Sequence, residues 1–318
     1  MYFPVAGVEV NPLVPPLVAF VISLFTSMGG VSGAFLLLPF QVSVLGFTSP
    51  AVSSTNQLFN IVAIPSGVFR YIREGRMVWP LTWIVIIGTL PGVLAGAIVR
   101  IKYLPDPKHF KLFVGLVLLY IGGKLLKDLL FKRKEIGRSS TEERFQRQLK
   151  RQVKTEATRT TAPVVPLARV TVQQWTFSRI VYDFCGETFT VNAIGVMVLS
   201  LIVGMVGGVY GIGGGAIIAP FFVSFFGLPI YTVAGAALMG TLVTSVAGVI
   251  FYQILAPYYP GVMITPDWLL GLFFGVGGFA GMYCGARLQK FVPAKFIKWV
   301  LVFCLLFTAG KYIFPFLA

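Results

Sequence analysis

The sequence has 318 residues, of which 56% are hydrophobic and 12% are charged. Soluble domains carry about 25% charged residues, so the composition excludes an ordinary soluble protein and indicates an all-α integral membrane protein. The net charge of +15 does not indicate nucleic-acid binding, because the basic residues gather at the ends of apolar runs and in one central segment, as the positive-inside rule predicts.

The first predicted element is the apolar run Leu13–Phe47, whose 35 residues exceed the length of one comfortable membrane span. A glycine-rich turn at 29–33 divides the run, which is therefore predicted to form a re-entrant hairpin or two short spans. Pro39 is expected to start or kink the helix after the turn, because proline lacks the N–H group that an inner helical turn needs.

Further elements complete the first part of the chain. They are a helix with a polar face at 51–69, a basic turn at 70–76, and spans at 79–99 and 112–131 joined by a loop at 100–111. In the first of these spans, Gly88, Gly92 and Gly96 recur every four residues, a spacing that lets two helix backbones approach closely. Arg70 and Arg100 stand near helix ends, where a basic side chain usually extends towards the membrane surface.

Residues 132–188 differ from the rest, because they hold 12 Lys and Arg against six acidic residues and contain no spanning run. The alternating pattern of 169–191 predicts a small β-hairpin that turns near Gly186. We interpret the whole segment as a basic cytoplasmic linker with few core positions, held to the membrane surface by its charge.

The remainder of the chain repeats its beginning. At a fixed offset of 181 positions, 12 of the 42 residues from Gly30 to Tyr71 are identical to their counterparts. The second glycine turn lies at 211–215 and is followed by Pro220. Spans are then predicted at 230–254, 268–286 and 299–316. The sequence thus predicts a transmembrane repeat at 1–131, the linker at 132–188 and a second transmembrane repeat at 189–318.

The orientation of the repeats follows from the charges of their loops. If each glycine-broken element enters and leaves on one side, the repeats are inverted, and the short loops carry seven Lys and Arg inside against four outside. Parallel repeats would give three against eight, so the positive-inside rule favours inversion, although the basic loop 100–111 does not fit it. We therefore expect a multi-pass plasma-membrane protein with a cytoplasmic linker and both termini outside.

Inverted repeats with broken helices are typical of transporters, which bind substrates near the membrane midplane where the repeats meet. A helix that begins inside the membrane has unsatisfied N–H groups and a partial positive charge, and glycines let an anion approach them. The turns Gly29–Gly33 and Gly211–Gly215 are therefore expected to face each other and to bind a small anion.

A polar cluster on the helix after the first turn supports this hypothesis. Hydrogen bonds between helices would explain a single hydroxyl there, but the neighbouring Asn56, Gln57 and Asn60 favour substrate coordination. Neutral amides can bind the oxygens of an anion without burying a permanent cation. Arg70, at the end of that helix, is the candidate for an inner gate that attracts anions.

Two halves that each open with a GGxxG-to-Pro element, Gly29–Pro39 and Gly211–Pro220, followed by Ser53–Asn56, resemble the TauE/SafE sulfite and sulfonate exporter family. The basic insert with its turn at Tyr182–Glu187 is similar to the linker of longer members. The resemblance covers essentially the whole chain. It implies export of small sulfur-containing anions such as sulfite, sulfoacetate or related organosulfonates.

These motifs give one set of candidate residues. The candidate substrate-binding residues are Gly29, Gly30, Ser32, Gly33, Asn56, Gln57, Asn60, Gly211, Gly213, Gly214, Gly215, Thr241, Thr244 and Ser245. The candidate gating residues are Arg70, Pro39 and Pro220. The expected partners are the sulfur anion and the lipid bilayer, and a homo-oligomer is left open.

The sequence does not indicate an enzyme. No acidic or basic residue stands in the middle of a predicted span, and the single histidine, His109, lies in a predicted loop. We therefore expect no catalytic residue, metal or cofactor, and export driven by the membrane potential and the substrate gradient without a proton-binding side chain. An anion channel, or a permease for another small organic anion, shares these features and stays an alternative.

Overall fold

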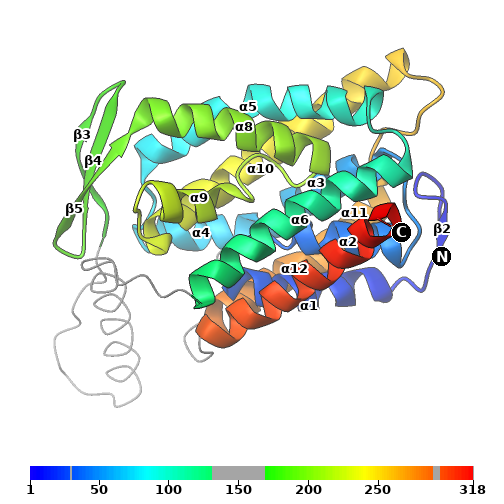
Figure 1. The fold of residues 1–318 in the computed structure, drawn as a ribbon, viewed down its shortest axis with the longest axis horizontal. Helices are drawn as coiled ribbons and strands as arrows, with labels where there is room; N and C mark the ends of the chain where they lie inside the picture. The colour runs from blue at the N-terminus through cyan, green and yellow to red at the C-terminus, as the bar shows by residue number, and fades with distance from the viewer. Residues whose placement is uncertain (29–30, 131–168, 289–293, 318) are drawn as a thin grey trace.

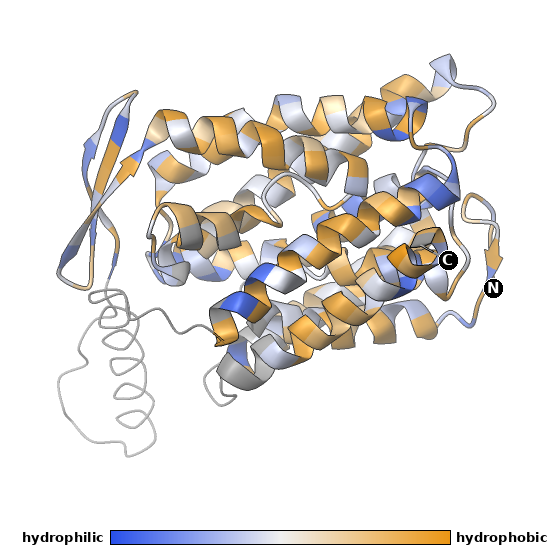
Figure 2. Cartoon of the chain, in the orientation of Figure 1, coloured by the Kyte–Doolittle hydropathy of each residue, from blue (hydrophilic) through white to orange (hydrophobic). Residues whose placement is uncertain are grey.

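The computed structural model describes residues 1–28, 31–130, 169–288 and 294–317, which form a bundle of helices with a small sheet at one end (Figure 1). The helices are α1 (Val14–Met28), α2 (Ala34–Ser43), α3 (Ala51–Ala63), α4 (Pro65–Arg73), α5 (Trp79–Lys102), α6 (Pro107–Leu130), α8 (Ala193–Tyr210), α9 (Ile218–Phe225), α10 (Ile230–Leu255), α11 (Trp268–Leu288) and α12 (Ala294–Leu317), with a 3₁₀ turn at Ala256–Tyr258. Within the described ranges, six helices are long and apolar enough to cross a membrane. Hydrophobic residues run along most of their length (Figure 2), which confirms the predicted helical membrane protein.

Each half opens with a pair of helices that meet at a glycine-rich segment, as predicted, although Gly29 and Gly30 of the first segment lie outside the described residues. The first pair is α1 and α2, and the second is α8 and α9. The first helix of the second pair has 18 residues and is long enough to span a membrane, so this pair is not two short helices. Helix α8 ends at Gly211, whose φ of +80° lies in the left-handed region that favours glycine, and Gly213 follows with a φ of +77°. Pro220 lies in the first turn of α9, as expected for a residue that starts a helix. Pro39 lies inside α2 instead.

The predicted continuous helix at 51–69 is wrong, because the structure divides it into α3 and α4 at Ile64. The cause is Pro65, which has no N–H group to donate to the preceding turn. The predicted loop at 100–111 is also too long. Helix α5 extends to Lys102 and α6 begins at Pro107, so Arg100 belongs to a helix.

The first helix of each half packs against a helix of the other half. Helix α1 packs most extensively on α11 of the second half, and α8 packs on α5 of the first. A Cβ atom at Gly92 of α5 would collide with the carbonyl oxygen of Leu201, and one at Gly281 of α11 with that of Phe20. Leu201 and Phe20 are separated by the same 181 positions as the sequence repeat. The close helix crossings therefore follow the repeat.

Corresponding helices of the two halves also run in opposite directions. In Figure 1, α1 runs from the end that holds both termini towards the opposite end, whereas α8 starts beside the sheet and runs back. Helices α6 and α12, the last of each half, pack on each other and likewise run in opposite directions. This arrangement is compatible with two inverted repeats.

The strands are β1 (Tyr2–Phe3), β2 (Val8–Glu9), β3 (Thr171–Trp175), β4 (Arg179–Phe184) and β5 (Glu187–Asn192), and the last three form one antiparallel sheet in chain order. The turn between β4 and β5 contains Gly186 with a φ of +78°, which confirms the predicted hairpin. The sheet packs on the helices more closely than expected. The buried Tyr182 hydroxyl lies 2.9 Å from the Thr232 hydroxyl of α10. Residues 132–168 of the predicted linker lie outside the described ranges.

Candidate functional site

The two glycine turns meet around two buried asparagines of α3. The Asn56 side-chain N–H group donates to the carbonyl oxygens of Ala34, after the first turn, and Gly211, in the second, at 3.0 and 3.1 Å. One turn further along α3, Asn60 donates to the carbonyl oxygen of Ile212 at 3.0 Å. Helix α3 therefore joins the two breaks directly, and each of these amides touches both halves of the chain.

The side-chain oxygen atoms of both asparagines also accept hydrogen bonds. The Ser32 hydroxyl donates to Asn60 Oδ1 at 2.6 Å, and Asn60 Nδ2 also donates to Ser245 Oγ of α10 at 3.3 Å. Gln41 Nε2 of α2 donates to Asn56 Oδ1 at 3.3 Å. Four predicted residues and Gln41 thus form one buried network. In this network, both asparagine amides donate and accept hydrogen bonds.

Gln57, between these asparagines in sequence, has a different environment. Its side chain is fully buried, yet neither Nε2 nor Oε1 has a hydrogen-bond partner among the described residues. The amide lies directly against Gly248 of α10, where a Cβ atom would collide with it. A buried polar group without a partner costs about 1–3 kcal/mol. The Gln57 amide is therefore a buried polar group to which the described residues offer packing but no hydrogen bond.

The corresponding position in the second half is apolar. At the repeat offset of 181 positions, Gln57 corresponds to Leu238, and Gly67 corresponds to Gly248. The structure reproduces this relation, because a Cβ atom at Gly67 would lie 3.3 Å from a Leu238 methyl group. The same packing contact is thus made by a leucine in one half and by an amide in the other. Packing alone does not require the amide.

The second glycine turn leaves donors unused. The Gly214 N–H group donates to the Thr244 hydroxyl at 2.9 Å. The main-chain N–H groups of Gly213 and Gly215 donate no hydrogen bond to the described residues. The hydroxyls of Thr241 and Thr244 donate to carbonyl groups of their own helix, at 2.8 and 2.6 Å. The turn can therefore offer main-chain donors more readily than threonine hydroxyls.

Two further contacts close the site, and the sequence analysis did not single out the residues that make them. The Tyr210 hydroxyl at the end of α8 donates to the Phe35 carbonyl oxygen of α2 at 2.7 Å. Gln41 is the other. An amide in the apolar segment 34–43 carries the same burial cost that drew attention to Asn56, so this signal was readable. A tyrosine next to a glycine turn gives no comparable signal.

The remaining predicted residues are spread over several places. Gly33 packs beside Ser23, whose hydroxyl oxygen would lie 2.9 Å from an added Cβ atom. The Pro39 carbonyl oxygen accepts a hydrogen bond from the Tyr312 hydroxyl at 3.2 Å. Pro220 lies in α9, and Gly29 and Gly30 lie outside the described residues.

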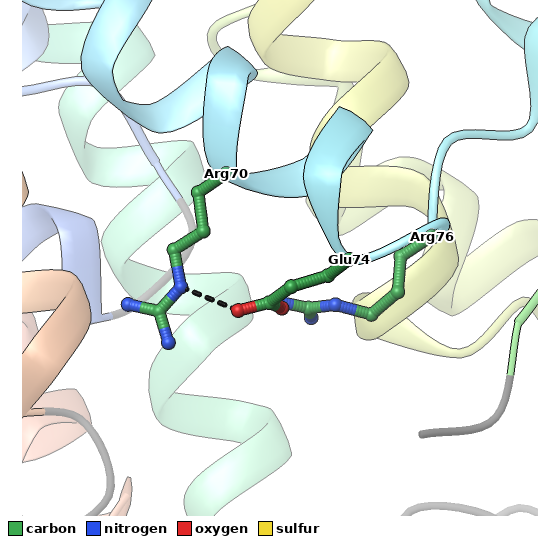
Figure 3. A network of polar contacts seen from close by, with 3 residues as sticks. All are labelled: Arg70, Glu74 and Arg76. Carbon is green, nitrogen blue, oxygen red and sulfur yellow. Dashed lines mark hydrogen bonds and ion pairs between the residues drawn. The ribbon is translucent and has the colours of Figure 1, made fainter. Parts of the chain in front are cut away.

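The predicted gate residue Arg70 belongs to a charged cluster at the end of α4. Arg70 Nε donates to Glu74 Oε1 at 2.7 Å, and Arg76 bonds to the other carboxylate oxygen of Glu74, so Glu74 lies between two guanidinium groups (Figure 3). Burial raises the pKa of Glu74, but the charge of Arg76 and the hydrogen bond and charge of Arg70 outweigh it, leaving the pKa below its usual value. No hydrogen bond links Arg70 to the asparagine network within the described ranges.

This lowered pKa predicts an acid-sensitive contribution to stability. A carboxylate with a depressed pKa in the folded state stabilises the protein above its unfolded-state pKa and loses that effect as the pH falls through the folded value. Glu74→Gln should therefore lower the melting temperature near neutral pH, by a few degrees for about 1 kcal/mol. The difference from wild type should vanish in acid well below the ordinary value of 4.5. A difference that stays constant with pH in thermal unfolding would contradict the assignment.

A comparison with known families was made for the whole sequence. A family model described as "Sulfite exporter TauE/SafE" matches residues 16–312. The match includes both glycine turns, the asparagine network and all but the end of the last helix. No curated protein and no solved structure matches the chain.

Proposed function

The chain belongs to the TauE/SafE sulfite exporter family, and from that membership we propose that it exports sulfite, sulfoacetate or a related organosulfonate through a site between its two halves. The family is one of membrane transporters, and six apolar helices agree with a multi-pass membrane protein. The proposal concerns the individual substrate and the place where it binds.

The observation that carries the proposed site is the buried, unpartnered amide of Gln57. Its Nε2 atom has two N–H donors, and Gly213 and Gly215 provide two main-chain donors at the second glycine turn. Both the amide and the turn pack against α10. Sulfite and sulfonate groups present three oxygens that accept hydrogen bonds. A substrate oxyanion between Gln57 and the second glycine turn would satisfy these donors, which is why the amide is retained where the other half has Leu238.

Neutral donors suit a transporter that must release its substrate. A hydrogen bond to a charged group contributes about 1.5–3 kcal/mol, whereas a fixed buried cation would hold an anion more strongly and would be costly without it. The amides of Asn56 and Asn60 hold the two glycine turns together. Each such bond contributes only about 1 kcal/mol, so separating the turns to admit a substrate breaks few and weak contacts.

We place the linker and the basic end of α4 in the cytoplasm and both termini outside, as the distribution of charge favours. The two repeats are then inverted, which agrees with the opposite directions of α1 and α8 in Figure 1. An anion that leaves a cell with a negative interior gains about 2.3 kcal/mol per charge per 100 mV. Export therefore requires no proton-binding residue in the site.

Sulfite flux from proteoliposomes tests this proposal. An imposed membrane potential without a pH gradient should drive flux that saturates with sulfite. Asn60→Ala should reduce this flux at least tenfold, because the three hydrogen bonds that position the two turns around Asn60 are lost. The exposed amide variant Gln174→Ala is the matched control and should transport normally.

Each alternative has its own result in this assay. Flux that requires a pH gradient and ignores the potential would contradict the proposed driving force. Flux that rises linearly with sulfite and shows no exchange across the membrane would indicate a channel. Flux of another organic anion in the absence of sulfite flux would reject the substrate.

A further inference from the structure

Arg100, near the end of α5, is fully buried, although its position in the sequence predicted a side chain that extends to the membrane surface. One terminal N–H group of its guanidinium donates to the Leu104 carbonyl oxygen, and the other donates to that of Thr48 at 3.4 Å. The guanidinium carbon lies 3.7 Å from the centre of the Phe110 ring. The Nε atom has no hydrogen-bond partner among the described residues.

This buried cation lacks a counter-charge. No carboxylate in the described ranges lies within ion-pair distance of Arg100. Its neighbours on α5, Ala97 and Ile101, pack in one buried cluster with Tyr252 of α10. Carbonyl groups and a ring face offset only part of the cost of burying a charge. Charged residues inside membrane proteins are usually paired or mark the path of an ion. Fixing the turn between α5 and α6 requires hydrogen-bond donors, but it does not require a charge.

The place of Arg100 relates it to the proposed substrate site. The turn between α5 and α6 lies at the end of the bundle that holds both termini, opposite the sheet (Figure 1). Tyr252 stands seven residues after Ser245 of the asparagine network on the same helix, which corresponds to about 10 Å along α10. Arg100 is therefore displaced from the network towards the end that we place outside the cell.

We propose that Arg100 forms a second anion-binding site, which receives the substrate from the glycine turns before its release to the outside. This inference rests on the proposed function and extends it. The Nε–H group and a terminal N–H group of a guanidinium match two oxygens of one sulfite or sulfonate group. The anion would take the place of one carbonyl partner and supply the missing negative charge.

External sulfite exchange tests the proposal. Arg100→Gln should raise the external sulfite concentration that gives half-maximal exchange at least tenfold. The maximal rate should change less, because the proposed site binds sulfite that enters from the outside. Arg100→Lys keeps the charge without the planar fork and should give an intermediate shift. Lys102→Gln, a change at an exposed basic residue on the same helix, is the control and should behave as wild type. An Arg100→Gln protein that folds and shows wild-type half-saturation would overturn the site.

A second measurement does not depend on the variant. Crystals of the wild-type protein grown with bromide should show an anomalous peak within hydrogen-bond distance of Arg100 Nε. A peak at Gln57 with none at Arg100 would overturn the second site and leave the proposed function intact. Conversely, wild-type protein that moves no sulfite would reject the proposed function, and the bromide map would still decide whether Arg100 binds an anion.

Discussion

Replacing Gln57 by leucine is expected to reduce sulfite transport at least tenfold while leaving the protein as stable as wild type or more stable. The change removes a buried amide that has no hydrogen-bond partner among the described residues, so the substitution breaks no hydrogen bond to them. It installs the residue that the second half already uses at this position, Leu238. The loss of donors to a bound anion, about 1.5–3 kcal/mol per bond, corresponds to a decrease of one to two orders of magnitude.

The measurement pairs initial sulfite flux in proteoliposomes with thermal unfolding in detergent. Leu238→Met, a change of similar volume at the equivalent position, is the matched control and should alter neither quantity by much. Unchanged flux in Gln57→Leu would show that the amide does not bind substrate. A marked loss of stability would show that it has a structural partner.

Replacing Gly215 by alanine is expected to destabilise the protein by about 3 kcal/mol or more, enough to prevent recovery of folded protein. An added Cβ atom would collide with the carbonyl oxygen of Ala237 and would also approach the main chain of Thr241 on α10. Both obstacles are helix backbone, which cannot rotate away as a side chain can. The close approach of the second glycine turn to α10 is therefore a condition for forming the site.

The matched control is Gly123→Ala on α6, where no atom lies within 4 Å of an added Cβ. Alanine is the better helix former by about 1 kcal/mol, so this variant should melt at or above the wild-type temperature. The two variants are compared by size-exclusion chromatography and by thermal unfolding in detergent. Equal stability of Gly215→Ala and Gly123→Ala would mean that the turn is not packed against α10 as described.

Much of this site was readable from the sequence because its signals are local. A glycine turn that recurs at a fixed offset predicted the two breaks, and amides in an apolar helix singled out Asn56 and Asn60. They were predicted to coordinate substrate, and in the structure their amide groups donate to carbonyl oxygens beside the breaks. The period-two pattern before Gly186 predicted the hairpin. Each of these signals depends on the backbone needs or burial cost of residues close together in the chain.

The features that the sequence analysis missed depend on distant contacts. Arg100 lies in the last turn of a helix, where exposure is the ordinary expectation, and it is buried because Phe110 and Thr48 from other elements contact it. Tyr182 was assigned to a linker with few core positions, but the sheet packs against α10, and Thr232 meets its hydroxyl. The break before Pro65 is the exception, since proline chemistry alone would have predicted it.

Single hydroxyls were expected to join helices, but two beside the site bond instead to the segment before α11. The Ser54 hydroxyl donates to the Ile264 carbonyl oxygen at 2.7 Å, and Thr55 accepts from the Asp267 main-chain N–H group at 2.9 Å. These contacts attach α3 to the segment that leads into α11. They satisfy both hydroxyls within the protein, and this sets Gln57 apart on the same helix.

The most direct test of the account is an experimental structure of the protein saturated with selenite, a heavier analogue of sulfite that is visible by its electron density. The account predicts a pyramidal anion within hydrogen-bond distance of Gln57 Nε2 and of main-chain N–H groups in Gly211–Gly215. A saturated structure that shows selenite elsewhere, with Gln57 bonded to a protein group, would contradict the central claim that the two glycine turns and this amide form the substrate site.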